Sequence, residues 1–165
     1  MTTIIIINYK SEQLTVDYVT KELSKLKGEF NTIVVNNAAT SDSNNYLCKA
    51  LEAEMVSLDN FKESKKRRYI VPSKENLGFA KGNNLATEIA AKHLKSRYLL
   101  FSNNDIVIKD TDIIDRLTEK LNADNRIGII GPEVIGLKGE RQSPEPYKPF
   151  RDRYCWMYIS TPFMS

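Results

Sequence analysis

Four short apolar runs, separated by helical patterns, constrain the fold of this chain more than any other feature of its sequence. Residues 3–7 and 32–35 are rich in β-branched side chains. Residues 69–71 and 98–101 are two further apolar runs of similar length. Uninterrupted runs of this kind are typical of strands that are buried on both faces, as in a parallel sheet. The sequence therefore predicts four such strands.

The intervals between these runs contain apolar residues spaced three or four positions apart, as on one face of a helix. These residues are Val16, Val19, Leu23 and Leu26 in the first interval, Tyr46, Leu47, Ala50 and Leu51 in the second, and Leu85, Ile89, Ala90 and Leu94 in the third. Gly28 is placed to end the first helix, and Asn83 and Asn84 are placed to cap the third. Strands that alternate with helices predict an α/β fold with a mostly parallel sheet and helices on both of its faces.

The pattern changes after residue 105. A helix is predicted from the apolar positions Ile113, Ile114, Leu117 and Leu121. A strand at residues 127–130 and a hairpin around Lys138 and Gly139 are predicted to follow. Residues 141–165 end without a helix or a cap, and we therefore expect a C-terminal truncation.

Length and charge exclude several classes of protein. A chain of 165 residues is long enough for one domain with a sizeable core. Its 24 basic and 21 acidic residues give a net charge of +3, which is too balanced to indicate a nucleic-acid partner. The densest basic run contains Lys62, Lys65, Lys66, Arg67 and Arg68. It predicts either a solvated loop or a patch for phosphate or an anionic membrane surface.

The cysteines and the N-terminal segment favour a cytoplasmic protein. Cys48 and Cys155 lie far apart and belong to no CxxC or Cys/His grouping, which argues against zinc and for a reducing compartment. No basic segment precedes the apolar start, and no apolar run approaches about 18 residues, the length needed to span a membrane. Neither a secretory signal nor a transmembrane helix is predicted.

Polar segments follow all four predicted strands, at residues 8–11, 36–43, 72–84 and 102–105. Ligands of open α/β sheets bind beyond the carboxyl ends of the strands, so these segments are expected to converge on one crevice. Asn36, Asn37 and Asp42 could contact a base or a ribose there, although polar residues after a strand often only form turns.

Residues 76–84 combine Gly78 and Gly82 with the start of a helix, which leaves backbone N–H groups free to approach phosphate oxygens. Lys81 would add a cation. The segment matches neither a Walker A loop nor the GxGxxG pattern of dinucleotide folds. The alternative is a glycine turn capped by asparagines.

Residues 102–105 follow the fourth strand and end on a carboxylate. Asp105 could bridge a divalent cation such as Mg or Mn to a diphosphate, because these ions need only one or two protein carboxylates. The alternative is a turn made of Asn and Asp. His93 has no neighbouring Cys or second His and is interpreted as a surface residue on an exposed part of the third helix.

Five segments, in this order and spacing, resemble family 2 glycosyltransferases, especially the rhamnosyltransferase-like branch. They are residues 7–11, 34–37, 76–84, 99–108 and 131–134. The string N-L-G-F-A-K-G-N-N at residues 76–84 is the most specific of them. The resemblance extends over residues 3–145.

The resemblance implies a GT-A fold that binds a nucleoside-diphosphate sugar. Residues 1–108 would form the nucleotide-sugar-binding half, and residues 109–165 would begin the acceptor side, which includes Gly131 and Pro132. The implied nucleotide-sugar-binding residues are Asn8, Tyr9 and Asn36 around the nucleobase, Asn76, Gly78, Phe79, Lys81 and Asn84 beside the nucleotide, and Asn103 and Asn104. The segment Asn103-Asn104-Asp105 occupies the position of the family's D-x-D element. Asn103 would contact the ribose or the sugar, and Asp105 would hold the metal, Mg or Mn.

The resemblance also implies transfer of the sugar with inversion to a hydroxyl of a saccharide or lipid-linked acceptor, in the synthesis of cell-surface polysaccharide. Peripheral contact with the inner face of the membrane would suit a lipid-linked acceptor. The oligomeric state is not predicted.

Two departures from the family pattern affect this hypothesis. The family usually has aspartate at the position of Asn36, so the base contact would come from a neutral amide. The family's general base lies in a Glu-Asp pair, and no such pair occurs in these 165 residues. We therefore expect binding of the donor with little transfer.

Two other functions compete with the glycosyltransferase. The first is a non-catalytic nucleotide-sugar-binding module. The second is a nucleotidyltransferase, which ranks last because it needs a glycine-rich loop after the first strand, and residues 8–11 contain no glycine.

Overall fold

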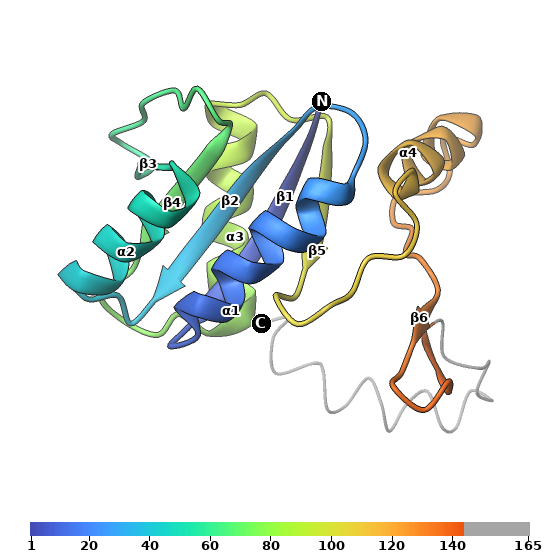
Figure 1. The fold of residues 1–165 in the computed structure, drawn as a ribbon. Helices are drawn as coiled ribbons and strands as arrows, with labels where there is room; N and C mark the ends of the chain where they lie inside the picture. Colours follow the sequence, from blue (N-terminus) through green and yellow to red (C-terminus); the bar gives the residue numbers. More distant parts are fainter. Residues whose placement is uncertain (144–165) are drawn as a thin grey trace, which may run out of the picture. The chain divides into compact units, whose positions relative to one another are not determined.

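The computed structural model describes residues 1–143, and the chain divides into two compact units, Met1–Asp115 and Arg116–Ser165. The first unit is built on one sheet of five strands (Figure 1). In spatial order the strands are β3 (Glu54–Met55), β4 (Arg68–Pro72), β2 (Phe30–Asn37), β1 (Thr2–Tyr9) and β5 (Tyr98–Ser102). Every neighbouring pair is parallel. The predicted α/β class with a parallel sheet is therefore confirmed.

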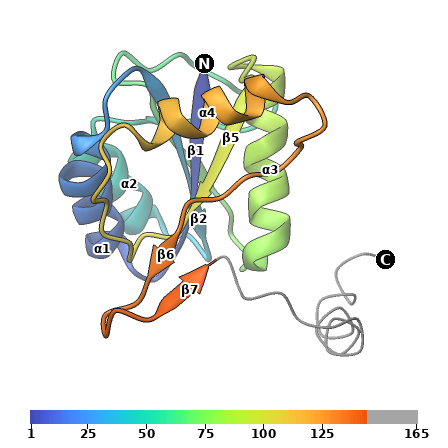
Figure 2. The ribbon, with the colours of Figure 1, turned by 90° about the vertical axis from the view of Figure 1, so that its right-hand side faces the viewer.

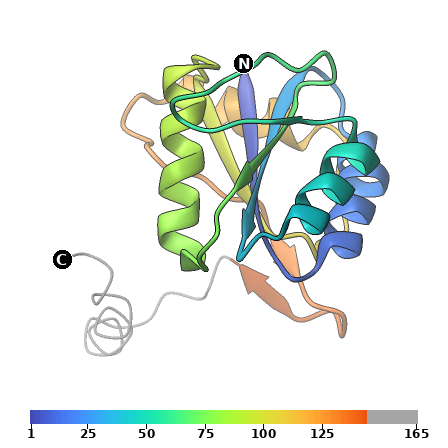
Figure 3. The same ribbon diagram turned by 90° about the vertical axis from the view of Figure 1, so that its left-hand side faces the viewer.

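Helices cover both faces of this sheet. The helices α1 (Glu12–Asp17) and α2 (Ser41–Leu51) lie on one face, and α3 (Gly78–Lys92) lies on the other (Figures 2 and 3). Two short helical segments continue α1, the π-helix η1 (Tyr18–Glu22) and the 3-10 helix η2 (Leu23–Lys25). They end before Gly28, whose φ of 83° no other residue type adopts as readily. The predicted first helix thus exists, with three successive helical geometries.

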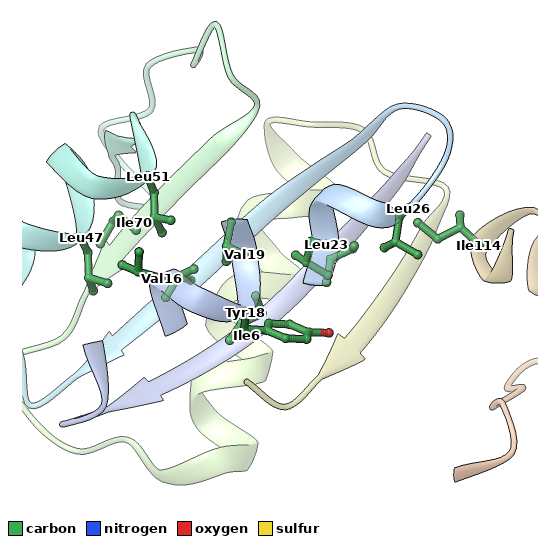
Figure 4. Close-up of a cluster of buried hydrophobic side chains, with 12 residues drawn as sticks. Ile6, Val16, Tyr18, Val19, Leu23, Leu26, Leu47, Leu51, Ile70 and Ile114 are labelled. Carbon is green, nitrogen blue, oxygen red and sulfur yellow. The ribbon is translucent and has the colours of Figure 1, made fainter. Parts of the chain in front are cut away.

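Alternate residues of the central strand β1 enter two separate cores, as the period of two of a strand requires. Ile4 and Ile6 pack with side chains of α1, η1 and α2, the cluster drawn in Figure 4. Ile5 packs against Ala86 and Ile89 of α3. Ile4, Ile5 and Ile6 are 0% exposed and Ile7 is half-buried, which explains why the sequence of β1 is an uninterrupted apolar run.

The predicted cap of the third helix at Asn83 and Asn84 is wrong, because α3 already begins at Gly78. The turn before the helix is made by Asn76, whose Oδ1 accepts the N–H of Gly78 at 2.9 Å. Gly78 has a φ of 67°, which glycine adopts without steric cost. Asn83 is a buried residue inside the helix instead.

The predicted strand at residues 127–130 is also wrong. These residues have no regular structure, and Ile129 is 94% exposed, because no strand among the described residues pairs with them. The neighbouring predictions are confirmed: α4 (Ile113–Ala123) forms, and β6 (Val134–Ile135) and β7 (Arg141–Ser143) make an antiparallel hairpin. Gly139, with a φ of 82°, lies in its turn. The two-residue strand β3 was too short to be predicted.

The prediction that His93 lies on an exposed part of α3 is wrong. It follows the last residue of the helix, where its ring stacks on Phe61 with 4.6 Å between ring centroids. Its Nε2 lies 2.8 Å from the carbonyl oxygen of Leu58. The ring is half-buried because the chain between β3 and β4 folds over this end of the helix. His93 therefore anchors a loop.

Gly82 allows α3 to approach β1 closely. A Cβ atom built on Gly82 would lie 3.0 Å from Cδ1 of Ile7. Gly82→Val is therefore expected to lower the free energy of unfolding by about 1–3 kcal/mol, the usual cost of overpacking a core. Ala80→Val, at an exposed position of the same helix, controls for the helix propensity of valine. Equal losses in the two variants, measured by urea unfolding, would contradict the packing role.

Candidate functional site

The order of the strands identifies one place on the sheet where a ligand is expected. After β1 the chain adds β2 and then β4 on one side, whereas β5 returns to the other side of β1. The direction of winding reverses between β1 and β5, which lie side by side in Figure 2. Doubly wound sheets bind ligands outside the carboxyl ends of the two strands at such a switch point. The segments there begin with Tyr9 and Asn103.

The structure brings three predicted site residues, Asn8, Asn36 and Asn104, into one hydrogen-bond network. Asn8 Nδ2 donates to Asn36 Oδ1 at 2.7 Å. Asn8 Oδ1 accepts the hydroxyl protons of Ser11 at 3.1 Å and Thr15 at 2.8 Å. Asn104 Nδ2 donates to the same two hydroxyl oxygens, at 3.1 Å and 2.8 Å. We call these five residues the amide network.

Asn8 and Asn36 point into the protein. Both are 0% exposed, and Asn36 Nδ2 donates to Ser43 Oγ at 2.9 Å and to Asn44 Oδ1 at 2.8 Å. Their amides are thus engaged with neighbouring protein groups below the carboxyl edge of the sheet. The nucleobase contact expected of these two residues stays a prediction.

Other predicted site residues at this edge present exposed side chains. Tyr9 is 47% exposed, and the ammonium group of Lys10 lies 5.4 Å from the centroid of its ring. Asn103 and Asp105 are both exposed, on either side of the half-buried Asn104. An aromatic ring, a cation, an amide and a carboxylate therefore lie on the two segments that flank the switch point.

A second group of predicted residues surrounds the start of α3, beyond the ends of β2 and β4. Phe79, Lys81 and Asn84 are exposed, with Phe79 at 61%. Asn37 joins this group to β2, because its Oδ1 accepts the N–H of Leu77 and its Nδ2 donates to the carbonyl of Gly78, both at 3.4 Å. The N-cap residue of α3, Leu77, makes no side-chain cap hydrogen bond, but Asn76 Oδ1 accepts the N–H of Gly78. The positive end of the helix dipole of α3 and the ammonium group of Lys81 have the chemistry to attract an anion.

One face of the first helical segment holds the chain that follows β5 (Figure 2). Besides the contacts of Ser11 and Thr15, the hydroxyls of Tyr18 and Ser102 are 2.5 Å apart. Glu22 Oε2 accepts the N–H of Ile108 at 2.7 Å. The four holding residues are spaced four, three and four positions apart, as neighbours on one helix face are. This spacing is visible in the sequence, but the residues that the four side chains contact are remote in the chain and could not be identified from it.

Two of these holding groups have altered acidity. Burial raises the pKa of the Tyr18 hydroxyl above its usual value, and the negative charges of Glu22 and Asp105 raise it further. The phenol therefore remains protonated and can donate a hydrogen bond to Ser102. The ammonium of Lys25 and then the N–H of Ile108 lower the pKa of Glu22, so this carboxylate stays ionised while it holds the backbone.

A divalent cation at this edge would have to be shared with a ligand. Among residues 1–143, no group of three or more His, Cys, Asp or Glu side chains could hold a metal ion by itself. A single exposed carboxylate, Asp105, suits magnesium or manganese ions, which complete their coordination with phosphate oxygens and water. Metal binding would therefore depend on a phosphate-containing ligand.

The basic run at residues 62–68 lies toward the opposite edge, before β4. Lys62 pairs with Glu54 at 3.3 Å, Lys66 with Glu52 at 3.7 Å, and Arg67 with Glu29 at 3.0 Å. These exposed pairs are each weak, but they reduce the local positive charge. The run therefore lends little support to a membrane-binding patch, and peripheral membrane contact stays a prediction.

Comparison with models of known protein families gives no match, and comparison with curated protein sequences gives none either. Within the described part of the chain, no helix is both long enough and apolar enough to cross a membrane.

Proposed function

We propose that this chain binds a nucleoside-diphosphate sugar at the carboxyl ends of β1 and β5, as the donor-binding part of a glycosyltransferase. The observation that supports this most is the switch point between β1 and β5. It brings Tyr9 and the segment Asn103-Asn104-Asp105, which are remote in sequence, to the edge where such sheets bind ligands.

The exposed groups at this edge suit the parts of a nucleotide sugar. The ring of Tyr9 offers an apolar face for a nucleobase, and the adjacent Lys10 adds positive charge for a phosphate. Asn103 offers an amide to a ribose or sugar hydroxyl. Asp105 would hold magnesium or manganese, which stabilises the negative charge of a departing diphosphate. The start of α3, with Gly78 and Lys81, would support the nucleotide from the β2–β4 side.

The proposed reaction is inverting transfer of the sugar to a hydroxyl group of a saccharide or lipid-linked acceptor. A general base must remove the hydroxyl proton as that oxygen attacks the anomeric carbon. We assign no general base to the described residues, so the roles proposed for this chain are donor binding and metal binding. Nucleotide-sugar donors and a reducing environment are consistent with the proposed cytoplasmic location.

The proposal is tested by calorimetric titration of the chain with uridine, guanosine and thymidine diphosphates and their hexose conjugates, with and without manganese. We expect at least one of these ligands to bind, and manganese to strengthen that binding. Adenosine, a nucleoside without phosphate, is the control. Manganese should not change its affinity for the chain. The proposal is wrong if none of the ligands binds, or if manganese leaves every affinity unchanged.

A further inference from the structure

The position of Asp105 is not set by the sheet. The ladder between β1 and β5 ends at the pair Ile6 and Ser102, so strand pairing stops before Asn103. Asn104 is the half-buried residue of this turn, between two exposed neighbours. Because Asp105 is bonded directly to Asn104, whatever fixes Asn104 restricts where the carboxylate can lie.

Ser11 and Thr15 are the residues that fix Asn104. Its Nδ2 donates to Thr15 Oγ1 at 2.8 Å and to Ser11 Oγ at 3.1 Å. Thr15 is 0% exposed, so its side chain has little freedom to move. The N–H of Thr15 also donates to the carbonyl of Ser11 at 3.0 Å, which holds the two hydroxyls in one turn of helix.

The hydrogen bonds of the amide network run in a single direction. Asn104 donates to the two hydroxyls, and both hydroxyls donate to Asn8 Oδ1. Asn8 in turn donates to Asn36. Each hydroxyl has only one proton and donates it to Asn8. Each hydroxyl oxygen can therefore only accept a hydrogen bond from the residue at position 104. The network therefore selects an amide donor at position 104 and fixes its orientation.

We propose that Ser11 and Thr15 are positioning residues for Asp105: they hold the cation-binding carboxylate in place through the side chain of Asn104. This inference rests on the proposed function and extends it to two residues that touch neither the cation nor the nucleotide. Thr15 makes the shorter bond and is the more buried of the two. It should therefore have the larger effect.

The test uses Thr15→Val, which keeps the shape of the side chain and removes the hydroxyl. We expect affinity for each nucleoside diphosphate that binds in the presence of manganese to fall about tenfold, the lower end of what partners of a metal ligand contribute. Affinity without manganese should change little, which a general loss of folding would not produce. Ser11→Ala, at a less buried position, should have the same effect to a smaller extent. It tests the inference independently if Thr15→Val does not fold.

Thr20→Val is the matched control. Thr20 lies on the same helical segment, is exposed, and donates its hydroxyl proton only to the carbonyl of Val16, at 2.7 Å. It should bind manganese and nucleotide as the native chain does. In the background of Asp105→Ala, Thr15→Val should cause no additional loss, because a positioning residue has no effect once the group it positions is absent.

The outcomes separate this inference from the proposed function. If the native chain binds none of the diphosphates with manganese, the proposed function fails and the inference fails with it. If the native chain binds but Thr15→Val behaves like Thr20→Val, only the inference is overturned. The same holds if the losses caused by Thr15→Val and Asp105→Ala are additive.

Discussion

Asn8→Ala is expected to lower the free energy of unfolding by about 3–5 kcal/mol, since each buried polar group left without a partner costs about 1–3 kcal/mol. The substitution removes the acceptor of the Ser11 and Thr15 hydroxyls and the donor to Asn36 Oδ1. Asn36, Thr15 and Asn8 are all 0% exposed, so water cannot easily replace the lost bonds. Urea unfolding followed by circular dichroism measures the loss.

Asn45→Ala is the matched control for this prediction. Asn45 is an exposed residue of α2, so the same change of side chain should alter stability by no more than about 0.5 kcal/mol. A single buried hydrogen bond can contribute about 1 kcal/mol to the free energy of unfolding, and Asn8→Ala removes several. A decrease smaller than this would therefore be too small for an intact network. It would mean that the amide network is not formed in solution.

Asp105→Ala should weaken manganese-dependent nucleotide binding about 100-fold or more, because even the outer partners of a metal ligand contribute about 10–100-fold. The carboxylate is the only acidic group in the exposed turn 103–105, and the cation bound there would otherwise retain only ligand oxygens and water. Calorimetry with and without manganese separates this loss from the binding of the nucleotide alone.

Asp59→Ala is the control for charge. Asp59 is an exposed residue next to Leu58, whose carbonyl contacts His93 at the far end of α3 from Gly78. Its removal changes the net charge equally, at the opposite edge of the sheet, and should leave binding intact. Stability should be nearly unchanged in both variants, because both carboxylates are exposed. Equal affinities for Asp105→Ala and the native chain would exclude Asp105 as the metal ligand.

The strands were predicted from sequence because burial on both faces leaves a strong local signal. In β1, Ile4, Ile5 and Ile6 are apolar without alternation, since one core lies on each side of the strand. The prediction for residues 127–130 failed because an apolar run specifies a strand only where a partner strand exists. The start of α3 was misplaced because Asn76 and Asn83 are chemically identical, and only the backbone at Gly78 decides between them.

The candidate site was predicted in part. The polar residues near the carboxyl ends of β1 and β2 and after β5 were identified, and three of them meet in the amide network. Their directions were not predictable, because asparagine serves equally well as a buried donor and acceptor or as a ligand contact. Asn8 and Asn36 point inward, whereas Asn103 points to the surface. Ser11 and Thr15 were missed because hydroxyls at the start of a helix are common and carry little information by themselves.

By itself, the sequence determined that the chain alternates strands and helices and that polar segments follow the strands, because helical periodicity and burial of a strand are local properties. Only the tertiary structure decided that β5 pairs with β1, which creates the switch point. It also decided that Asn104 meets hydroxyls 93 and 89 positions away in the chain. Such contacts depend on how whole elements pack together, and no local pattern of residues specifies them.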